Sequence, residues 1–493
     1  MRLEDRKLVK DVGKYMAILA LAIVACRFTN GYFAIAMALV GLCWAFASNF
    51  GRALSCFAFF PLLIVLDQGI LQQTVASAIV LRIAPLLIGL VLFIMSNSRR
   101  GANRLPFGTL FGYLFLAVIS SMNGWCPSIS YMKIINFAIF LTGIWLGTQN
   151  LQERLQDVCK ERIFFLALSG IVVFGSLAVI PFPAISYSTN LVWSGTKTQA
   201  EAAAAMAELV ASGGVSLFSG ILNQSQALAP VLSCCIALTL SDMLFIEKRV
   251  TVIHGAIIAL GLVELYMTRS RTGLFSCTIG LFMVLIYAGK RLYLSSMARA
   301  KVRKMISTGI LLLIILVVVG EISNRTITKW IYKSNDAIAQ ENAEFGEALT
   351  STRQMLIDLS IQEFKMNPVF GMGFQVNFET DYLYGGRGIA FSAPVEKGLL
   401  PMAILGEGGI VGSIAFIVFL ICFYTTCARK KLHITIAMFT TFLATNIGEA
   451  TFFSPGGIGG ILWMICVVGG FALDTMMLSG RQQLRYEQYN DKW

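Results

Sequence analysis

Charged residues are scarce in this sequence. Of 493 residues, 13% are Asp, Glu, Lys or Arg and 56% are hydrophobic, with a mean hydropathy of +0.72. Globular domains carry roughly 25% charged residues. Histidine occurs only twice. This composition excludes an ordinary water-soluble domain and indicates a polytopic membrane protein.

The apolar residues gather in runs that approach the length of a membrane helix, which needs about 20 residues. We therefore predict an all-α fold with about 14 transmembrane helices. The expected spans are 13–28, 32–47, 53–70, 74–95, 106–121, 129–147, 163–180, 226–245, 250–268, 273–289, 305–321, 410–427, 434–453 and 457–478.

Lysine and arginine are unevenly distributed between the segments that join these runs. With the N-terminus inside, the inside segments hold 26 of the 39 basic residues, although the outside segments include the two longest polar stretches. The positive-inside rule therefore predicts that both termini are cytoplasmic. The net charge of +12 then belongs mostly to loops facing anionic lipid headgroups, and nucleic acid is not an expected partner.

Four parts of the chain follow from this topology. Residues 1–321 hold eleven spans and an outer loop at about 181–225, and 322–397 form a large extracytoplasmic loop containing short helices. A re-entrant segment and three spans occupy 398–478, and 479–493 form a cytoplasmic tail. An internal repeat is absent, which weakens the alternative of a secondary transporter.

Metal-binding and disulfide patterns are also missing. Of the eleven cysteines, only Cys126 and Cys159 fall in predicted loops, on opposite sides of the membrane, and the outer loops contain no cluster of acidic residues. We therefore expect neither a metal nor another cofactor.

The segment Thr-Arg-Ser-Arg-Thr-Gly at 268–273 places two arginines between two apolar runs, at the predicted outer face. An arginine at a membrane edge pairs with an anion, reaches the headgroups or lines a wet cavity. The planar guanidinium favours bidentate contact with phosphate oxygens, so Arg269 and Arg271 are candidate phosphate ligands. The alternatives are contact with lipid headgroups, or pairing of one arginine with Glu264 one turn earlier.

Four charged residues fall inside apolar runs, which makes them candidates for a functional cavity. Arg82, Lys133, Glu264 and Glu449 would all lie at the depth of the outer leaflet. A cavity with several cations and a few carboxylates suits a polyprenyl diphosphate headgroup. For Arg82 and Lys133 the alternative is an ion pair that locks helices together.

Four motifs resemble the O-antigen ligase and Wzy polymerase superfamily, membrane glycosyltransferases of the GT-C type. They are SRTG at 270–273, STRQMLIDLSIQEFKMNPVFGMGFQ at 351–375, EKGLLPMAILGEGGIVG at 396–412 and GILNQSQALAP at 220–230, which contains Asn223. The second motif is similar to the family's arginine-led amphipathic helix, which ends in a Pro-x-x-Gly-x-Gly turn. Arg353 would be held by that helix over the membrane, or would be an ordinary residue at a helix start. Glu407, beside two glycines, is expected to mark a break between the re-entrant helix and the next span.

One departure from the family concerns catalysis. Ligases of this family typically carry a histidine where the large loop re-enters the membrane, and this chain has Ser-Ala-Pro-Val-Glu-Lys-Gly at 392–398 instead. The difference favours a polymerase. Glu396 is then the candidate base and Lys397 an addition to the phosphate site, unless the two only form an ion pair with each other.

The resemblance implies a polysaccharide polymerase in the bacterial inner membrane with its active site facing the periplasm. Arg271, Arg353 and Glu396 would be catalytic, and Arg269, Arg271, Arg82, Lys133 and Lys397 would bind the diphosphate. The partners would be a polyprenyl diphosphate-linked oligosaccharide, a growing polysaccharide acceptor, membrane lipids and a chain-length regulator. Transfer to a lipid acceptor by a ligase, a lipid-linked oligosaccharide flippase and an envelope scaffold are the alternatives.

Overall fold

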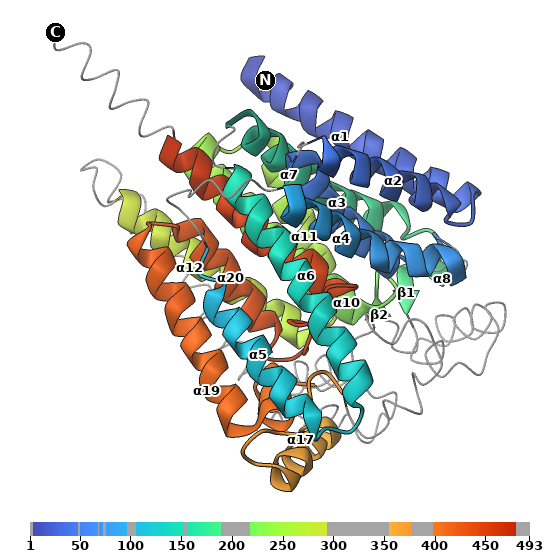
Figure 1. Ribbon diagram of the computed structural model, residues 1–493. Helices are drawn as coiled ribbons and strands as arrows, with labels where there is room; N and C mark the ends of the chain where they lie inside the picture. The colour runs from blue at the N-terminus through green and yellow to red at the C-terminus, as the bar shows by residue number, and fades with distance from the viewer. Residues whose placement is uncertain are drawn as a thin grey trace, which may run out of the picture.

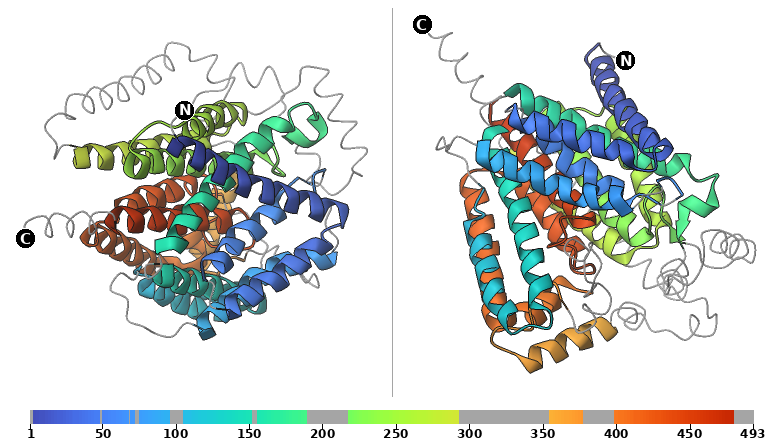
Figure 2. Two further views of the ribbon diagram at one scale, coloured as in Figure 1. Left: turned by 90° about the horizontal axis from the view of Figure 1, so that it is seen from above. Right: turned by 45° about the vertical axis from the view of Figure 1, so that its right-hand side comes forward.

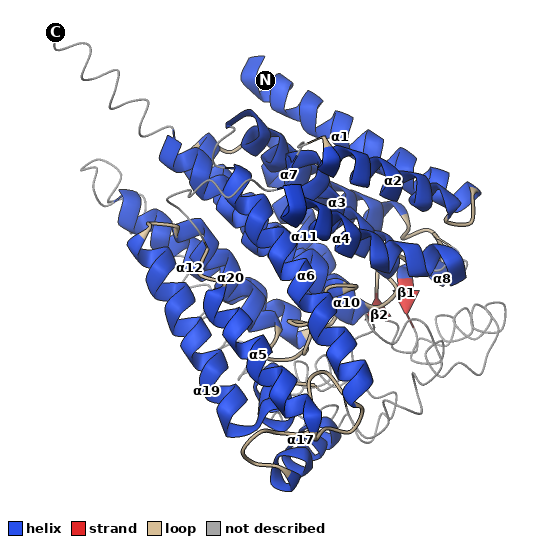
Figure 3. Cartoon of the chain, in the orientation of Figure 1, coloured by secondary structure: helices blue, strands red, loops and turns tan. Residues whose placement is uncertain are grey.

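Helices make up almost all of the structure, a computed structural model that describes residues 3–47, 50–67, 69–71, 75–95, 105–151, 155–188, 217–292, 354–376 and 398–479. Within these ranges the only strands are β1 (Tyr187–Ser188) and β2 (Leu217–Phe218), a short antiparallel pair (Figure 3). The predicted helical fold is confirmed for the described residues.

The order of helices follows the order of the apolar runs. The first seven are α1 (Leu3–Phe28), α2 (Tyr32–Phe46), α3 (Phe50–Val65), α4 (Val75–Met95), α5 (Gly108–Met122), α6 (Pro127–Leu151) and α7 (Leu155–Ala178). Then come α8 (Pro183–Ser186), α10 (Ser225–Ser241) with a π-helical end η1 (Asp242–Glu247), α11 (Val252–Met267), α12 (Arg271–Leu292) and α17 (Gln354–Met366). The chain closes with α19 (Leu400–Arg429), α20 (His433–Thr445), α21 (Ile458–Trp463) and the π-helical η2 (Met464–Gly469).

Six helices in the described part of the chain are long and apolar enough to cross a membrane, and shorter apolar helices accompany them. This supports a multi-pass membrane protein. The predicted span at 305–321 lies outside the described residues, so the number fourteen and the orientation stay predictions, as do the four chain parts. Residues 189–216 of the predicted outer loop at about 181–225, and most of the predicted large loop at 322–397, also lie outside the described residues.

The last helix forms the centre of the bundle. In its span, Ile458–Ser479, 89% of the most apolar 18-residue stretch is buried, and Trp463 packs against Phe107, Phe137 and Phe452. The start of α1 and the end of this helix lie at the same end of the bundle, as the N-in and C-in prediction requires (Figure 1). At the opposite end, α17 lies across the tips of α5, α6 and α19 (Figure 2). We call this the α17 end; the charge distribution predicts that it faces outward.

Short backbone contacts tie the α17 end together. The strand pair β1–β2 and an isolated bridge between Leu66 and Leu222 join the segment before α10 to the end of α3. The end of α20 is joined to the start of α19, since the Leu400 N–H donates to the Asn446 carbonyl oxygen at 3.0 Å. Segments far apart in the sequence therefore meet at this end.

Candidate functional site

The arginine segment forms a tight turn between two apolar helices. Helix α11 ends at Met267, Arg269 has a left-handed backbone (φ 51°), and α12 begins at Arg271. Ser270 caps α12, because its Oγ accepts a hydrogen bond from the Gly273 N–H at 3.2 Å. Positive φ is uncommon outside glycine and marks a backbone held in place by its surroundings.

Close packing fixes the start of α12 against α10. A Cβ atom at Gly273 would lie 2.5 Å from the Ala229 Cβ, so only glycine fits. Ser233 Oγ also donates to the Gly273 carbonyl oxygen at 2.7 Å. The two arginines therefore sit on a rigid helix start, whose N-terminal dipole adds to their attraction for anions.

The loop after α20 lies directly beside the first turn of α12. A Cβ at Gly448 would overlap the side chain of Thr272, so the backbone at Gly448 touches the first turn of α12. Glu449 is the next residue and is partly exposed. One acidic position is thus brought close to the arginine turn.

The predicted placement of Glu449 inside a membrane span is wrong. Helix α20 ends at Thr445 and Glu449 lies in the loop that follows. The Asn446 side chain ends the helix, because its Oδ1 accepts from the Thr451 N–H at 2.9 Å, and Gly448 and Pro455 follow. Apolar content alone could not show this, since Ala450, Phe452 and Phe453 are buried although they are not helical.

Glu264 does not pair with either arginine. Its residue is fully buried in α11, and neither carboxylate oxygen has a hydrogen-bond partner among the described residues. The alternative in which Glu264 neutralises Arg269 or Arg271 therefore finds no support in the structure.

The glycine turn after α17 is built as the sequence predicts. Gly371 and Gly373 have φ of 73° and 109°, and a Cβ at Gly371 would overlap the Glu407 backbone. The Gly373 N–H donates to the Glu407 carbonyl oxygen at 3.2 Å, and the Met372 N–H to Gly406 at 2.9 Å. The turn is therefore clamped onto α19.

Helix α19 breaks where the turn meets it. Gly409 has φ 60° and ψ −156° inside an otherwise helical run, which confirms the predicted break beside Glu407. Glu407 itself is buried, next to Tyr113 and Phe374 at a cavity of about 10 Å³. A space of that size holds at most one water molecule.

Lys133 reaches the same turn from α6. Its Nζ donates to the Gln375 carbonyl oxygen at 2.8 Å, and the side chain is 5% exposed. Ser130 Oγ donates to the Phe374 carbonyl oxygen at 2.9 Å, and Ser121 Oγ accepts from the Phe374 N–H at 3.3 Å. This contact of Lys133 is with protein backbone. The Phe374 ring also contacts Phe453, in the same loop as Glu449.

The remaining predicted residues are spread around this end or lie outside the described part. Arg82 is partly exposed in α4, which packs against α6 and α2. The Asn223 Oδ1 is buried without a hydrogen-bond partner in the described residues, just before α10. Arg353, Glu396 and Lys397 lie outside the described residues, next to the points where α17 and the start of α19 are first described.

Sequence reasoning did not single out Asp67. Its N–H donates to the Ile221 carbonyl oxygen at 2.9 Å and its Oδ1 accepts from the Gly69 N–H at 2.6 Å. Burial raises the pKa of this carboxyl to about 6, despite the opposing hydrogen bond from Gly69. Helix α3 ends at Val65, so Asp67 lies in the segment after the helix, although the predicted span 53–70 includes it. A lone acid in that predicted span was the available signal.

These features lie within and around a known family domain. Residues 256–417 match the family model described as O-antigen ligase. This region of the chain is an O-antigen ligase family domain. The match spans the arginine turn, α17 with its glycine turn, and the break in α19, and it indicates a membrane transferase that acts on lipid-linked glycans. A search of curated proteins gave no match.

Proposed function

We propose that this O-antigen ligase family protein is a polysaccharide polymerase. It transfers a glycan from a polyprenyl diphosphate to another lipid-linked repeat unit at the outer face of a bacterial inner membrane. The observation that carries the proposal is the arginine turn, with Arg269 and Arg271 on a helix start fixed by the contact of Gly273 with Ala229.

In this reaction a hydroxyl of the acceptor sugar attacks the anomeric carbon of the donor. The bond from that carbon to the diphosphate oxygen breaks, and its electron pair stays on the leaving diphosphate. The turn supports this chemistry because preorganised cations stabilise charge that develops in the transition state. Arginine also offers two parallel donors to a phosphate group.

The hydroxyl proton needs an acceptor, and we assign this role to Glu396. The two histidines, His254 and His433, lie in the first turns of α11 and α20, which start at the end of the bundle opposite α17 (Figure 1). Glu396 precedes Gly398 and Leu400, and Leu400 is bonded to Asn446 beside the loop that touches α12. Arg353, next to the first residue of α17, is a further cation on the donor in this proposal.

Ligase activity is the second candidate, because the matching family model is described as O-antigen ligase. The proposal favours polymerase because the re-entry segment 392–398 contains no histidine. A chain-length regulator is a proposed partner in the polymerase case only.

The experiment reconstitutes the purified protein in proteoliposomes with a lipid-linked repeat unit and, separately, with a lipid core acceptor. A ladder of products that grows by repeat units supports polymerase. A single transfer to the lipid core, with no ladder, would support ligase, and movement of the donor across the bilayer without transfer would support the flippase alternative.

A further inference from the structure

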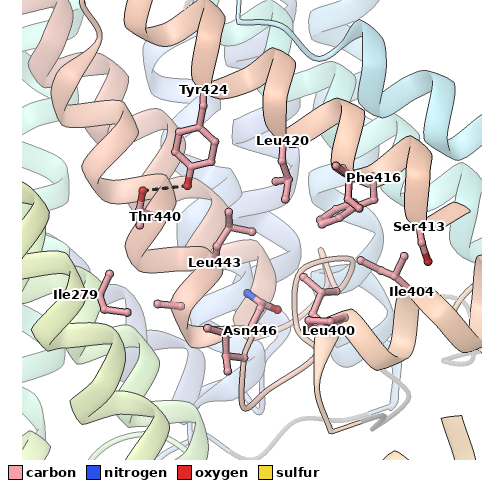
Figure 4. A pocket seen from close by; sticks show the side chains of 14 residues that line it. Ile279, Leu400, Ile404, Ser413, Phe416, Leu420, Tyr424, Thr440, Leu443 and Asn446 are labelled. Atoms are coloured by element: carbon pink, nitrogen blue, oxygen red, sulfur yellow. Dashed lines mark hydrogen bonds between the residues drawn. The ribbon is translucent and has the colours of Figure 1, made fainter. Parts of the chain in front are cut away.

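A groove of about 460 Å³ lies between α12, α19 and α20, on the side of the bundle away from α1. Its walls are mainly aliphatic and aromatic side chains of α19 and α20, with Ile279 from α12 (Figure 4). The polar site described above does not use this space.

The polar groups in the groove are already engaged. Tyr424 and Thr440 hydrogen-bond to each other at 2.9 Å, and Ser413 Oγ donates to the Gly409 carbonyl oxygen at 2.7 Å. The Asn446 side-chain amide donates to the Phe442 carbonyl oxygen at 2.9 Å. The walls therefore offer an occupant mostly hydrocarbon, which favours an apolar chain.

One end of the groove lies near the start of α12. Leu400 and Asn446 line that end and are bonded to each other, and two residues after Asn446 the chain touches Thr272, the neighbour of Arg271. Tyr424 and Thr440 lie at the other end (Figure 4). From Thr440 to Ala444 the groove follows α20 for about 6 Å, at 1.5 Å per residue, and Asn446 and Ile447 continue it past the end of the helix.

The groove also borders a largely exposed strip of α19. Ile414 and Ile421 are each 57% exposed and lie next in sequence to the lining residues Ser413 and Leu420. In a membrane protein such a strip faces lipid, so a chain could enter from the bilayer alongside α19.

We infer that this groove holds the first isoprene units of the donor's polyprenyl chain, while the diphosphate of the same molecule meets Arg269 and Arg271. The inference rests on the proposed function for the identity of the donor. It adds the position of the lipid chain and predicts that the protein selects donors by the length of their polyprenyl chain. A single chain with an anionic head matches one apolar groove with cations at one end.

Two matched pairs of variants test the inference through transfer. Ser413→Phe and Leu420→Trp put a ring into the groove, while Ile414→Phe and Ile421→Trp put the same ring on the exposed strip. Each is assayed with a donor carrying the full polyprenyl chain and with one carrying two isoprene units.

The groove variants should lower kcat/KM for the full-length donor by about tenfold or more. Tenfold corresponds to about 1.4 kcal/mol, which is less than burial of two methylene groups contributes. The short donor should lose less than about twofold, and the strip variants should match the wild type with both donors. Equal losses with both donors in a folded variant, or no loss with either, would overturn the inference.

A second measurement does not depend on transfer. The wild type is photolabelled with a diazirine-bearing polyprenyl phosphate that carries no glycan, and labelled peptides are mapped. We expect labels within 413–424 and 440–447, lost in Ser413→Phe or Leu420→Trp, and competed by unlabelled polyprenyl phosphate but not by phosphatidylglycerol. Labelling elsewhere, or equal competition by phosphatidylglycerol, would contradict a polyprenyl groove.

The two measurements separate the two proposals. Labelling in the groove with no transfer from any donor would reject the proposed function and keep the chain site. Normal polymerisation by folded Ser413→Phe and Leu420→Trp, with labelling unchanged, would keep the function and reject the chain site.

Discussion

Gly273 lies directly against Ala229, so closely that a Cβ on Gly273 would come within 2.5 Å of the Ala229 Cβ. This contact sets the separation of α10 and α12 at the α17 end. It also determines where Arg271, two residues earlier, can lie. The position of the arginine turn therefore depends on the absence of one methyl group.

Gly273→Ala should accordingly lower both stability and transfer activity. Overpacking of this kind commonly costs about 1–3 kcal/mol. Adding Ala229→Gly in the same protein should restore much of the loss, because it removes the opposing methyl group. The midpoint of thermal unfolding in detergent and the rate of transfer measure the two effects. Unchanged values in Gly273→Ala would mean that the helices separate without cost.

Asp67 predicts a pH dependence of stability. Burial raises the pKa of its carboxyl from the ordinary value of 3.8 to about 6 in the folded protein. The native state then binds the proton more tightly than the unfolded chain. The contribution of this carboxyl to the free energy of unfolding is therefore full below about pH 4 and is lost as the pH rises through 6. The midpoint of thermal unfolding of the wild type should therefore fall between these pH values, and Asp67→Asn should reduce that fall.

The control for this prediction is Asp358→Asn, since Asp358 is exposed on α17. It should leave the pH dependence of the wild type unchanged. If Asp67→Asn follows the same curve as the wild type, folding does not raise the pKa of Asp67.

Two roles of Glu396, as a general base and as an ion-pair partner of Lys397, can be distinguished by mutation. As a general base, Glu396→Gln should keep donor binding yet reduce turnover by roughly 10² to 10⁴-fold, and the pH–rate profile should lose one limb. If Glu396 is only an ion-pair partner of Lys397, the activity lost in Glu396→Gln should largely return in the double variant Glu396→Gln with Lys397→Met. Wild-type amounts of long polymer from Glu396→Gln would remove this residue from the mechanism.

Local features of the site were predictable from the sequence. The arginine turn, the glycine turn and the break at Gly409 each depend on backbone conformations that a few neighbouring residues dictate. Helices of the described ranges also follow the apolar runs, because the spacing of apolar residues and breakers is a local property.

Contacts between distant segments were not predictable. The bond from Lys133 to the Gln375 carbonyl oxygen joins residues 242 positions apart, and no local pattern encodes it. The same holds for the cluster in which Arg162 binds Asp242 at 2.6 Å and Asp242 binds His254 at 2.7 Å, at the end of the bundle opposite α17. Arg162 contributes to the charge bias that predicts the topology, yet its side chain is paired with Asp242 inside the fold.

Metal dependence offers a test of the electrophilic groups. If the arginines alone stabilise the leaving diphosphate, the purified protein should keep its activity in excess EDTA. Loss of activity in EDTA that magnesium or manganese restores would show that a divalent ion takes part. The assay is run both in detergent and in proteoliposomes, because EDTA also removes ions bound to lipid and this can change how the donor is presented. The two assays should agree.

The most direct test of the central claim is transfer by Arg271→Ala and Arg269→Ala in proteoliposomes with a polyprenyl diphosphate-linked repeat unit. Each should lower polymer formation by about 10²-fold or more, the usual loss when one preorganised charge-stabilising donor is removed. Lysine at either position should restore little, because it lacks the bidentate geometry. Arg429→Ala, an exposed arginine at the other end of α19, should behave like the wild type. Near-normal polymer from folded Arg271→Ala would contradict a phosphate site at this turn and return both arginines to contact with lipid headgroups.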